Sequence, residues 1–314
     1  MIKPLKTLFD WYVNQPVLLL ITAVLCWGAN TIFGQLAVDQ VTPVMVVFLR
    51  WAIVSALLWP FFGHRVKADW PLIRPRLGMT VLMASLGFTA FNSLFYAAAH
   101  TTTAINVGIL QGSMPIFVLV GSYLAFSTRV TGLQLFGSLI GLAGVIAVAT
   151  KGNPLAILEL DISFGDGLML FACLLYSFYT LALKNRPAIS GVSFFTLMAP
   201  IAMVTAIPLL VADIAANGFV PPTPQGWLVT FAIALLPSCL AQLVFLRGVD
   251  LIGPGPAGVY MNLTPVFGAA MSVTFLGEQF YGFHAAGLSM VIGGIWLVQR
   301  QAEGAAPRAV RTRA

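Results

Sequence analysis

Apolar residues run along this chain in long stretches, which are separated by short breaks rich in polar residues, glycine and proline. A helix that crosses a membrane needs about 20 mostly apolar residues. Ten such segments lie at 17–37, 43–62, 77–98, 104–125, 131–149, 164–183, 191–212, 226–247, 256–276 and 283–300. They are too long for β-strands and lack the alternation of a membrane barrel. The pattern therefore predicts an all-α integral membrane protein with ten transmembrane helices.

The composition supports a membrane location and argues against a soluble globular domain. Hydrophobic residues make up 59% of the chain and charged residues 8%, with a mean hydropathy of +0.93. Soluble proteins are about a quarter charged. The three cysteines, Cys26, Cys173 and Cys239, each lie inside an apolar run, so the sequence indicates neither a disulfide framework nor a metal site.

The net charge of +6 indicates membrane orientation and not binding to nucleic acid. With the N-terminus in the cytoplasm, 14 of the 16 lysines and arginines fall on cytoplasmic loops and tails, while Lys151 is outside and Arg50 lies within the second span. Membrane proteins keep lysine and arginine on the cytoplasmic side. Because the number of spans is even, both termini are predicted to be cytoplasmic.

The chain also contains an internal repeat with an offset of 150 residues. Laying residues 91–148 over 241–298 without a gap pairs many glycines, prolines and phenylalanines, which fix backbone geometry and close packing. The pairs include Phe95 with Phe245, Gly108 with Gly258, Pro115 with Pro265, Gly137 with Gly287 and Gly144 with Gly294. Internal repeats of hydrophobic segments are typical of secondary transporters.

The repeat divides the predicted spans into two halves of five, residues 1–150 and 151–300, followed by a basic cytoplasmic tail, 301–314, that is predicted to be disordered. An odd number of crossings places the second half upside down relative to the first. We therefore expect two inverted five-helix repeats, an architecture that can expose a central site to either side of a membrane in turn.

Several motifs in the two halves resemble one family. They are Phe95-Tyr96-Ala97-Ala98-Ala99 and Gly141-Leu142-Ala143-Gly144 in the first half, and Asn262-Leu263-Thr264-Pro265-Val266-Phe267 and Leu276-Gly277-Glu278 in the second. In order and spacing they are similar to EamA-type members of the drug/metabolite transporter superfamily. The resemblance covers nearly the whole chain, but the family's usual Gly-Glu-Arg after the fourth span reads Ser127-Thr128-Arg129 here. It implies a ten-helix exporter of small metabolites, such as amino acids, in a bacterial inner membrane.

Arg50 is the one cation within a predicted span, about 10 Å from the end of that span at 1.5 Å per residue. A charge at this depth is costly and is a functional candidate. Its guanidinium could bind a substrate carboxylate with a bidentate fork. It could instead be a structural arginine, which either snorkels to the membrane surface or pairs with Asp39 or Glu278 near the outer surface. The resemblance does not decide, since similar proteins commonly have an arginine in this span whatever they transport.

Amides and aromatic residues within the spans complete the expected substrate site. Asn92 aligns with Gln242 in the repeat, so both halves place an amide at one depth. Amides can bind a zwitterion or join helices, and aromatic residues deeper than an interfacial anchor can line a cavity or simply pack. The candidate substrate-binding residues are Trp27, Asn30, Arg50, Asn92, Tyr96, Gln111, Tyr179, Gln242, Tyr260 and Asn262.

Two prolines and a set of glycines are expected to shape the helices. Pro115 and Pro265 are repeat-related residues in the middle of spans, where each is either a hinge or a static kink. Small residues at three- and four-residue spacing let helices approach closely, so the glycines of the fifth and tenth spans are predicted to serve packing or dimer contact. These are Gly132, Gly137, Gly141, Gly144, Gly282, Gly287 and Gly294.

Together these features predict a secondary transporter that exports small metabolites, apolar or aromatic amino acids first, by alternating access through a central cavity. Its partners would be a small-molecule substrate and the lipid bilayer, with the chain a monomer or homodimer. The alternatives are a multidrug or amphiphile exporter, a carrier of phosphorylated sugars or nucleotide-sugars, a channel, or a membrane-embedded enzyme. A phosphate carrier needs several buried cations. No phosphate-binding Walker loop and no catalytic motif occurs, so no enzyme activity, cofactor or metal is expected.

Overall fold

The computed structural model describes residues 10–127, 131–153, 163–253, 257 and 260–305. All regular secondary structure in this part is helical, and no strand occurs there. Eight helices in this part are long and apolar enough to cross a membrane. Two shorter apolar helices, Met261–Leu276 and Gly282–Leu297, follow them. The all-α, multi-pass fold is thus confirmed, whereas ten crossings and their inverted order stay a prediction. Part of the predicted span 256–276 lies outside the described residues.

Nearly every predicted span is found, in many cases as several segments joined end to end. The α-helices are α2 (Pro16–Ala37), α3 (Pro43–Ala68), α4 (Trp70–Ile73), α5 (Leu77–Ala84), α6 (Phe91–Ala98), α7 (Ala104–Leu110), α8 (Met114–Phe126), α9 (Gly132–Ala149), α10 (Phe164–Ala182), α11 (Gly191–Asn217), α12 (Pro224–Ile233), α13 (Ala241–Ile252), α15 (Thr264–Met271) and α16 (Gly282–Ala305). Because α16 continues to Ala305, the first residues of the predicted disordered tail are helical, and 306–314 lie outside the described residues.

Serine and threonine at the ends of the predicted breaks start the helices. In six cases the side-chain oxygen of the residue before a helix accepts a backbone N–H of the first turn, which satisfies a donor that has no partner within the helix. The capping residues are Thr42, Thr103, Thr131, Ser163, Ser190 and Thr223.

Four interruptions of the α-helical ladder recur as two pairs at the 150-residue offset, whereas the π-helical stretch Ser272–Leu276 corresponds to a regular part of α8. A π-helical stretch, Ser85–Ala90, lies between α5 and α6, and another, Ala234–Leu240, lies between α12 and α13. A 3₁₀ turn, Gln111–Ser113, joins α7 to α8, and its counterpart Met261–Leu263 precedes α15. Matched distortions in the two halves agree with a duplicated backbone.

Pro115 and Pro265 explain the two 3₁₀ turns. Each is the second residue of its helix, α8 or α15, and has no N–H to donate to the carbonyl four residues before it. The carbonyl of Gln111 instead accepts from Met114, three residues on, and that of Met261 accepts from Thr264. A single missing donor therefore converts one turn from α to 3₁₀ in each half.

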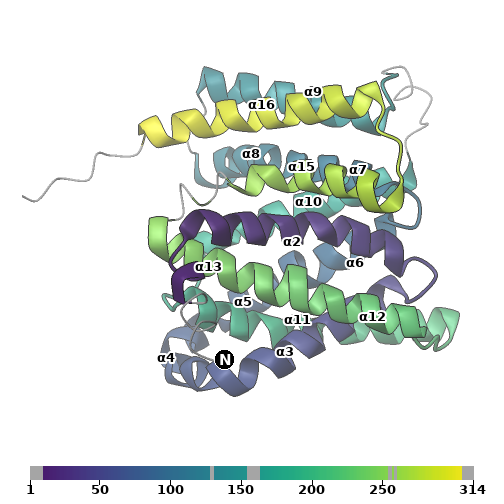
Figure 1. The fold of residues 1–314 in the computed structure, drawn as a ribbon. Helices are drawn as coiled ribbons and strands as arrows, with labels where there is room; N and C mark the ends of the chain where they lie inside the picture. The colour runs from purple at the N-terminus through teal and green to yellow at the C-terminus, as the bar shows by residue number, and fades with distance from the viewer. Residues whose placement is uncertain (1–9, 128–130, 154–162, 254–256, 258–259, 306–314) are drawn as a thin grey trace, which may run out of the picture.

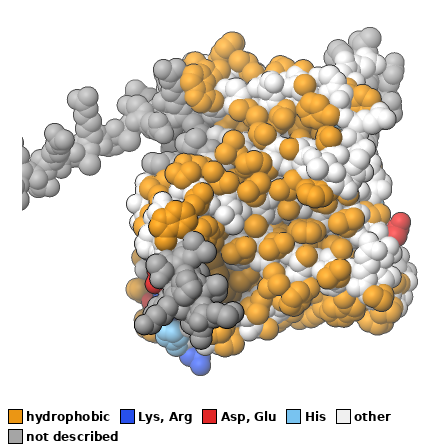
Figure 2. Space-filling view, in the orientation of Figure 1, with side chains coloured by type: hydrophobic (Ala, Val, Ile, Leu, Met, Phe, Trp, Pro, Cys, Tyr) orange, Lys and Arg blue, Asp and Glu red, His pale blue; other side chains and the backbone are white. Residues whose placement is uncertain are grey.

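The long helices lie side by side in a few layers, from α9 and α16 at one edge to α3 and α11 at the other (Figure 1). Between these edges α2 packs against α13 and α15, and α10 packs against α6 and α8. When each span is replaced by its counterpart in the other half, the contacts of α2 with α13 and α15 become those of α10 with α6 and α8. The contacts of α9 with α16 and of α3 with α11 remain the same. Apolar side chains cover most of the outer face seen in Figure 2, as expected for a surface that meets lipid.

The glycines of the fifth and tenth spans bring α9 and α16 into backbone contact. A Cβ at Gly144 would lie 2.7 Å from the carbonyl oxygen of Gly287, and a Cβ at Gly294 would lie 2.4 Å from that of Gly137. The two contacts are related by the repeat, because Gly144 corresponds to Gly294 and Gly287 corresponds to Gly137 at the 150-residue offset. These glycines pack helices, as predicted, whereas Gly132 and Gly282 have open space beside them.

Substitution of Gly294 by alanine should destabilise the protein. The added Cβ would meet Gly137 and Gly141 backbone atoms of α9, which cannot move aside alone, and overpacking costs about 1–3 kcal/mol. The neighbouring Gly293 has no atom within 4 Å of a Cβ. Gly293→Ala should be neutral or stabilising, by up to about 1 kcal/mol. Thermal unfolding in detergent measures both variants, and equal melting temperatures would contradict the contact.

Candidate functional site

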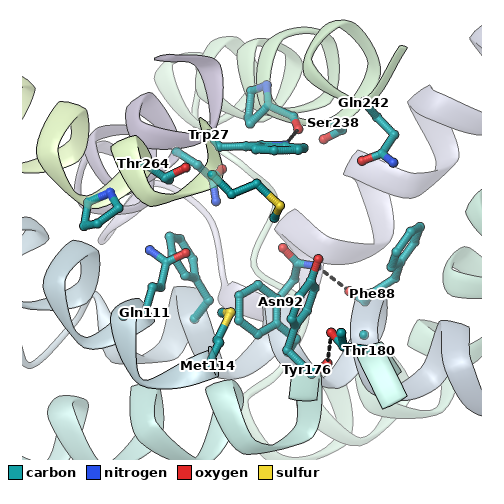
Figure 3. Close-up of a pocket in the computed structure, with 18 of the residues that line it drawn as sticks. Trp27, Phe88, Asn92, Gln111, Met114, Tyr176, Thr180, Ser238, Gln242 and Thr264 are labelled. Atoms are coloured by element: carbon teal, nitrogen blue, oxygen red, sulfur yellow. Dashed lines mark hydrogen bonds between the residues drawn. The ribbon is translucent and has the colours of Figure 1, made fainter. Parts of the chain in front are cut away.

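A cavity of about 390 Å³ lies between the two halves of the chain. Residues from both halves face it in Figure 3, with Trp27, Ser238, Gln242 and Thr264 across from Gln111, Met114 and Tyr176. Of the residues predicted from the sequence, those that line it are Trp27, Asn30, Arg50, Asn92, Gln111, Gln242 and Asn262, together with Pro115 and Pro265.

All four repeat-related helix interruptions contribute to the cavity wall. The π-helical stretches supply Gly87, Phe88, Pro237 and Ser238, and the 3₁₀ turns supply Gln111, Gly112, Met261 and Asn262. Such interruptions displace carbonyls from the regular ladder and are frequent at functional sites. The carbonyl of Phe88, for example, accepts from the side chains of Asn92, at 2.6 Å, and Trp51, at 3.3 Å.

Arg50 is held in the wall by neutral groups. Its Nη1 donates to Asn92 Oδ1 at 2.6 Å and to Tyr96 Oη at 2.9 Å. The hydroxyl of Tyr96 in turn donates to Asn30 Oδ1 at 2.9 Å. α2, α3 and α6 thus meet through one hydrogen-bonded chain, in which each group is oriented by the next.

The charge of Arg50 has no anionic partner in the described part of the chain. The side chain is 6% exposed, its Nε has no hydrogen-bond partner, and no carboxylate lies within ion-pair distance. This excludes the predicted alternative of pairing with Asp39 or Glu278. Glu278 instead accepts the backbone N–H groups of Ala104 and Ile105.

An aromatic ring packs against the buried cation, and further rings line the cavity. The guanidinium carbon lies 4.9 Å from the ring centroid of Trp51, which stacks on Phe88 with centroids 4.7 Å apart. Elsewhere in the cavity wall, Trp27 is fixed by a hydrogen bond of 3.0 Å from its Nε1 to the carbonyl of Pro237. The cavity therefore combines one cation, a few amides and rigid apolar walls.

Three predicted residues do not line the cavity. Tyr96 lies behind Arg50, 2% exposed. Tyr179 packs under Gly87, which leaves room for its ring, and contacts Phe88 and Tyr176. Tyr260, just before the 3₁₀ turn, is also absent from the lining. These tyrosines were predicted to line the cavity because they lie deep within their spans. Which neighbours a side chain contacts depends, however, on the face of the helix that carries it.

Several lining residues were missed, although the repeat could have found some of them. Thr180 lies 150 residues after Asn30, so the repeat offset pairs these two lining residues. Phe88, Phe91 and Phe195 carry no comparable signal, because phenylalanine is common throughout the apolar runs. In the described residues, no group of three or more His, Cys, Asp or Glu is placed to hold a metal.

A multi-pass membrane fold around a cavity with a buried cation is typical of a transporter of small molecules. The model of the EamA-like transporter family matches residues 14–150 and again residues 163–300. The chain belongs to this family.

Curated relatives carry transporter names. An uncharacterized transporter, YetK of Bacillus subtilis (strain 168), is 24% identical over 86% of this chain and 82% of its own length. A probable amino-acid metabolite efflux pump of Escherichia coli (strain K12) is 21% identical over 89% of this chain and 93% of its length. The uncharacterized inner membrane transporter YedA of E. coli K12 is 23% identical, over 87% and 86%.

A solved crystal structure has the same fold. One of its chains aligns with a TM-score of 0.61 at 17% identity, covering 93% of this chain and 99% of that one. At this identity the similarity concerns the fold alone.

Removal of the Tyr96 hydroxyl should destabilise the site. Tyr96→Phe leaves Asn30 Oδ1 without its donor and takes one acceptor from Arg50, and a buried unpaired polar group costs about 1–3 kcal/mol. The melting temperature in detergent should fall. Tyr123→Phe, at a side chain that is 56% exposed, is the matched control and should leave it unchanged. Identical melting curves for both variants would show that the hydrogen-bonded chain adds no stability.

Proposed function

We propose that this protein is a secondary exporter of small carboxylate-bearing metabolites, with apolar and aromatic amino acids as the first candidates. The observation that carries the proposal is Arg50, a buried cation in the cavity wall with an unpaired Nε and no anionic partner among the described residues.

The electrostatics of the cavity favour an anionic group on the substrate. A buried charge is unfavourable unless an opposite charge or hydrogen bonds compensate it. Asn92 and Tyr96 supply neutral acceptors on one side of the guanidinium. A substrate carboxylate would supply the missing charge, and arginine binds carboxylates with a planar pair of donors.

The size and walls of the cavity suit an amino acid with an apolar side chain. A volume of about 390 Å³ lies at the lower end of the range for small-molecule sites. Rings of Trp27, Trp51, Phe88 and Phe91 offer apolar surface to the side chain, and Gln111 and Gln242 offer amides to an ammonium or carboxylate. The E. coli relative named a probable amino-acid metabolite efflux pump is consistent with this class.

We infer a mechanism of alternating access between two inverted five-helix repeats, residues 1–150 and 151–300. Three observations support it: the helix interruptions recur at the 150-residue offset, exchange of the halves preserves the helix contacts, and the family model matches each half. Pro115 and Pro265 would act as paired hinges beside the 3₁₀ turns. The proposed setting is a bacterial inner membrane with both termini cytoplasmic, and the chain a monomer or homodimer.

The alternatives fit the cavity less well. A carrier of phosphorylated sugars needs several cations around a doubly charged phosphate, but Arg50 is the sole lysine or arginine in the cavity lining. An exporter of cationic or neutral amphiphiles would use the aromatic walls but would leave the charge of Arg50 uncompensated. A channel would not require the buried charge of Arg50 in its wall.

Export of toxic amino acid analogues and efflux from proteoliposomes test the proposal. Arg50→Lys keeps the charge but loses the planar fork, and should lower efflux of a labelled aromatic amino acid by roughly ten- to hundredfold, the range for a charge-assisted hydrogen bond. Arg65→Lys makes the same change on the exposed end of α3 and is the control. Equal efflux by Arg50→Lys, Arg65→Lys and wild type would refute a substrate role for Arg50.

A further inference from the structure

At one end of the helix bundle, the start of α7 is held by a carboxylate from the other half of the chain. Oε1 of Glu278 accepts the N–H of Ala104 at 2.9 Å, and Oε2 accepts the N–H of Ile105 at 3.0 Å. Both carboxylate oxygens are thus used, on two donors that a helix leaves unpaired. Gly277, at φ 66°, ends the preceding helix and turns the chain toward α7.

A second carboxylate of the same half holds the adjacent residues. Asp166, in the first turn of α10, is fully buried and accepts from the hydroxyl of Thr102. Its oxygens also face Nδ2 of Asn106, at 3.3 and 3.4 Å. Gln35 of α2 donates to the Thr102 carbonyl at 2.6 Å. Residues 102–106 are therefore tied to the second half by two negative charges.

The opposite end cannot form the same contacts, because the repeat is broken at these positions. The counterpart of Glu278 is Thr128, which has no carboxylate. The counterparts of Ala104 and Ile105 are Pro254 and Gly255, and proline has no N–H to donate.

The residues of the second set of contacts are replaced in the sequence of the opposite end as well. Asp166 corresponds to Pro16, Thr102 to Ile252 and Asn106 to Pro256. Each polar partner is thus replaced by a residue whose side chain can neither donate nor accept. These comparisons use residue identities alone, since 128 and 254–256 lie outside the described residues.

We propose that Glu278 and Asp166 form a one-sided latch on the start of α7. It keeps this end of the transporter closed. Because the residues that form it are replaced in the sequence of the other half, it biases the unloaded protein toward the conformation in which the cavity reaches only the opposite end. Two charge-assisted contacts present in one state and absent in the other shift the population strongly. In the predicted orientation the latched end faces outward. The inference rests on the proposed alternating access.

Within the latch the two carboxylates have different tasks. Asp166 is buried and bound through side chains, so it fixes the segment from inside the bundle. Glu278 is only partly buried, lies on the connection before α16 and binds backbone groups alone. Glu278 is therefore the contact that can break when this end opens.

Amide hydrogen exchange on the full-length protein in detergent measures the latch directly. Glu278→Gln retains one acceptor and Glu278→Ala none, so exchange of the Ala104 and Ile105 amides should become roughly ten- to hundredfold faster in Glu278→Ala and less so in Glu278→Gln. Asp250→Asn removes an exposed carboxylate of α13 and should leave these amides unchanged. Unchanged exchange in both Glu278 variants would overturn the proposal.

Sided labelling separates a latch from a static helix cap. The reporter is Ser238→Cys in the cavity wall, with Cys26 and Cys239 replaced by serine and the buried Cys173 retained. A single cysteine at the exposed Ala216 marks the latched end. An impermeant maleimide should reach position 238 only from the unlatched face, and Glu278→Ala should raise labelling from the latched face at least about tenfold.

If the Glu278→Ala variant is still labelled at position 238 only from the unlatched face, Glu278 is a helix cap and the latch is overturned, even if amide exchange is faster. Neither measurement uses a substrate. A failure of the latch can therefore be distinguished from a failure of the proposed export function, which the efflux of the Arg50 variants tests separately.

Discussion

The buried guanidinium of Arg50 is the constraint on which the rest of the site depends. A cation without a carboxylate partner inside an apolar bundle requires neutral acceptors in fixed positions. Asn92 and Tyr96 provide them, and Asn30 orients Tyr96, so three helices are joined at one point. What these neutral groups leave uncompensated is the charge of Arg50, and the proposed preference for an anionic ligand rests on it.

The backbone around this charge follows from the repeat. Duplicated prolines remove the same donor in each half and produce the same 3₁₀ turn. Duplicated glycines let α9 and α16 touch through their backbones. These shared positions build a frame that is nearly the same in both halves. Arg50, which has Pro200 as its counterpart, and Glu278, which has Thr128, break the symmetry. We propose that the first break serves substrate binding and that the second holds one end of the protein closed.

The sequence was sufficient to predict the helices and most of the polar residues that line the cavity, for identifiable reasons. Length and hydropathy determine a span, and the repeat offset correctly placed Asn92 and Gln242 at the same cavity. The direction of a side chain around its helix was not predictable in the same way. The π-helical stretches at Ser85–Ala90 and Ala234–Leu240 rotate the residues that follow, and no proline marks the first of them. Tyr96, which follows the first of these stretches, was assigned to the cavity although it packs behind Arg50. Tyr179 of α10 was assigned to it as well, but its ring packs against Gly87 of the first stretch. The partner of Glu278 is a pair of backbone amides, which no side-chain pattern reveals.

The most direct test of the account is a comparison of two ligands on two proteins. Phenylalanine and its carboxamide differ in whether they can present a carboxylate to Arg50. The account predicts that wild-type protein binds or exports phenylalanine at least about tenfold better than the amide, and that Arg50→Met removes most of this difference. Equal handling of the two compounds by the wild type, or an undiminished preference in Arg50→Met, would contradict the claim that Arg50 recognises a carboxylate.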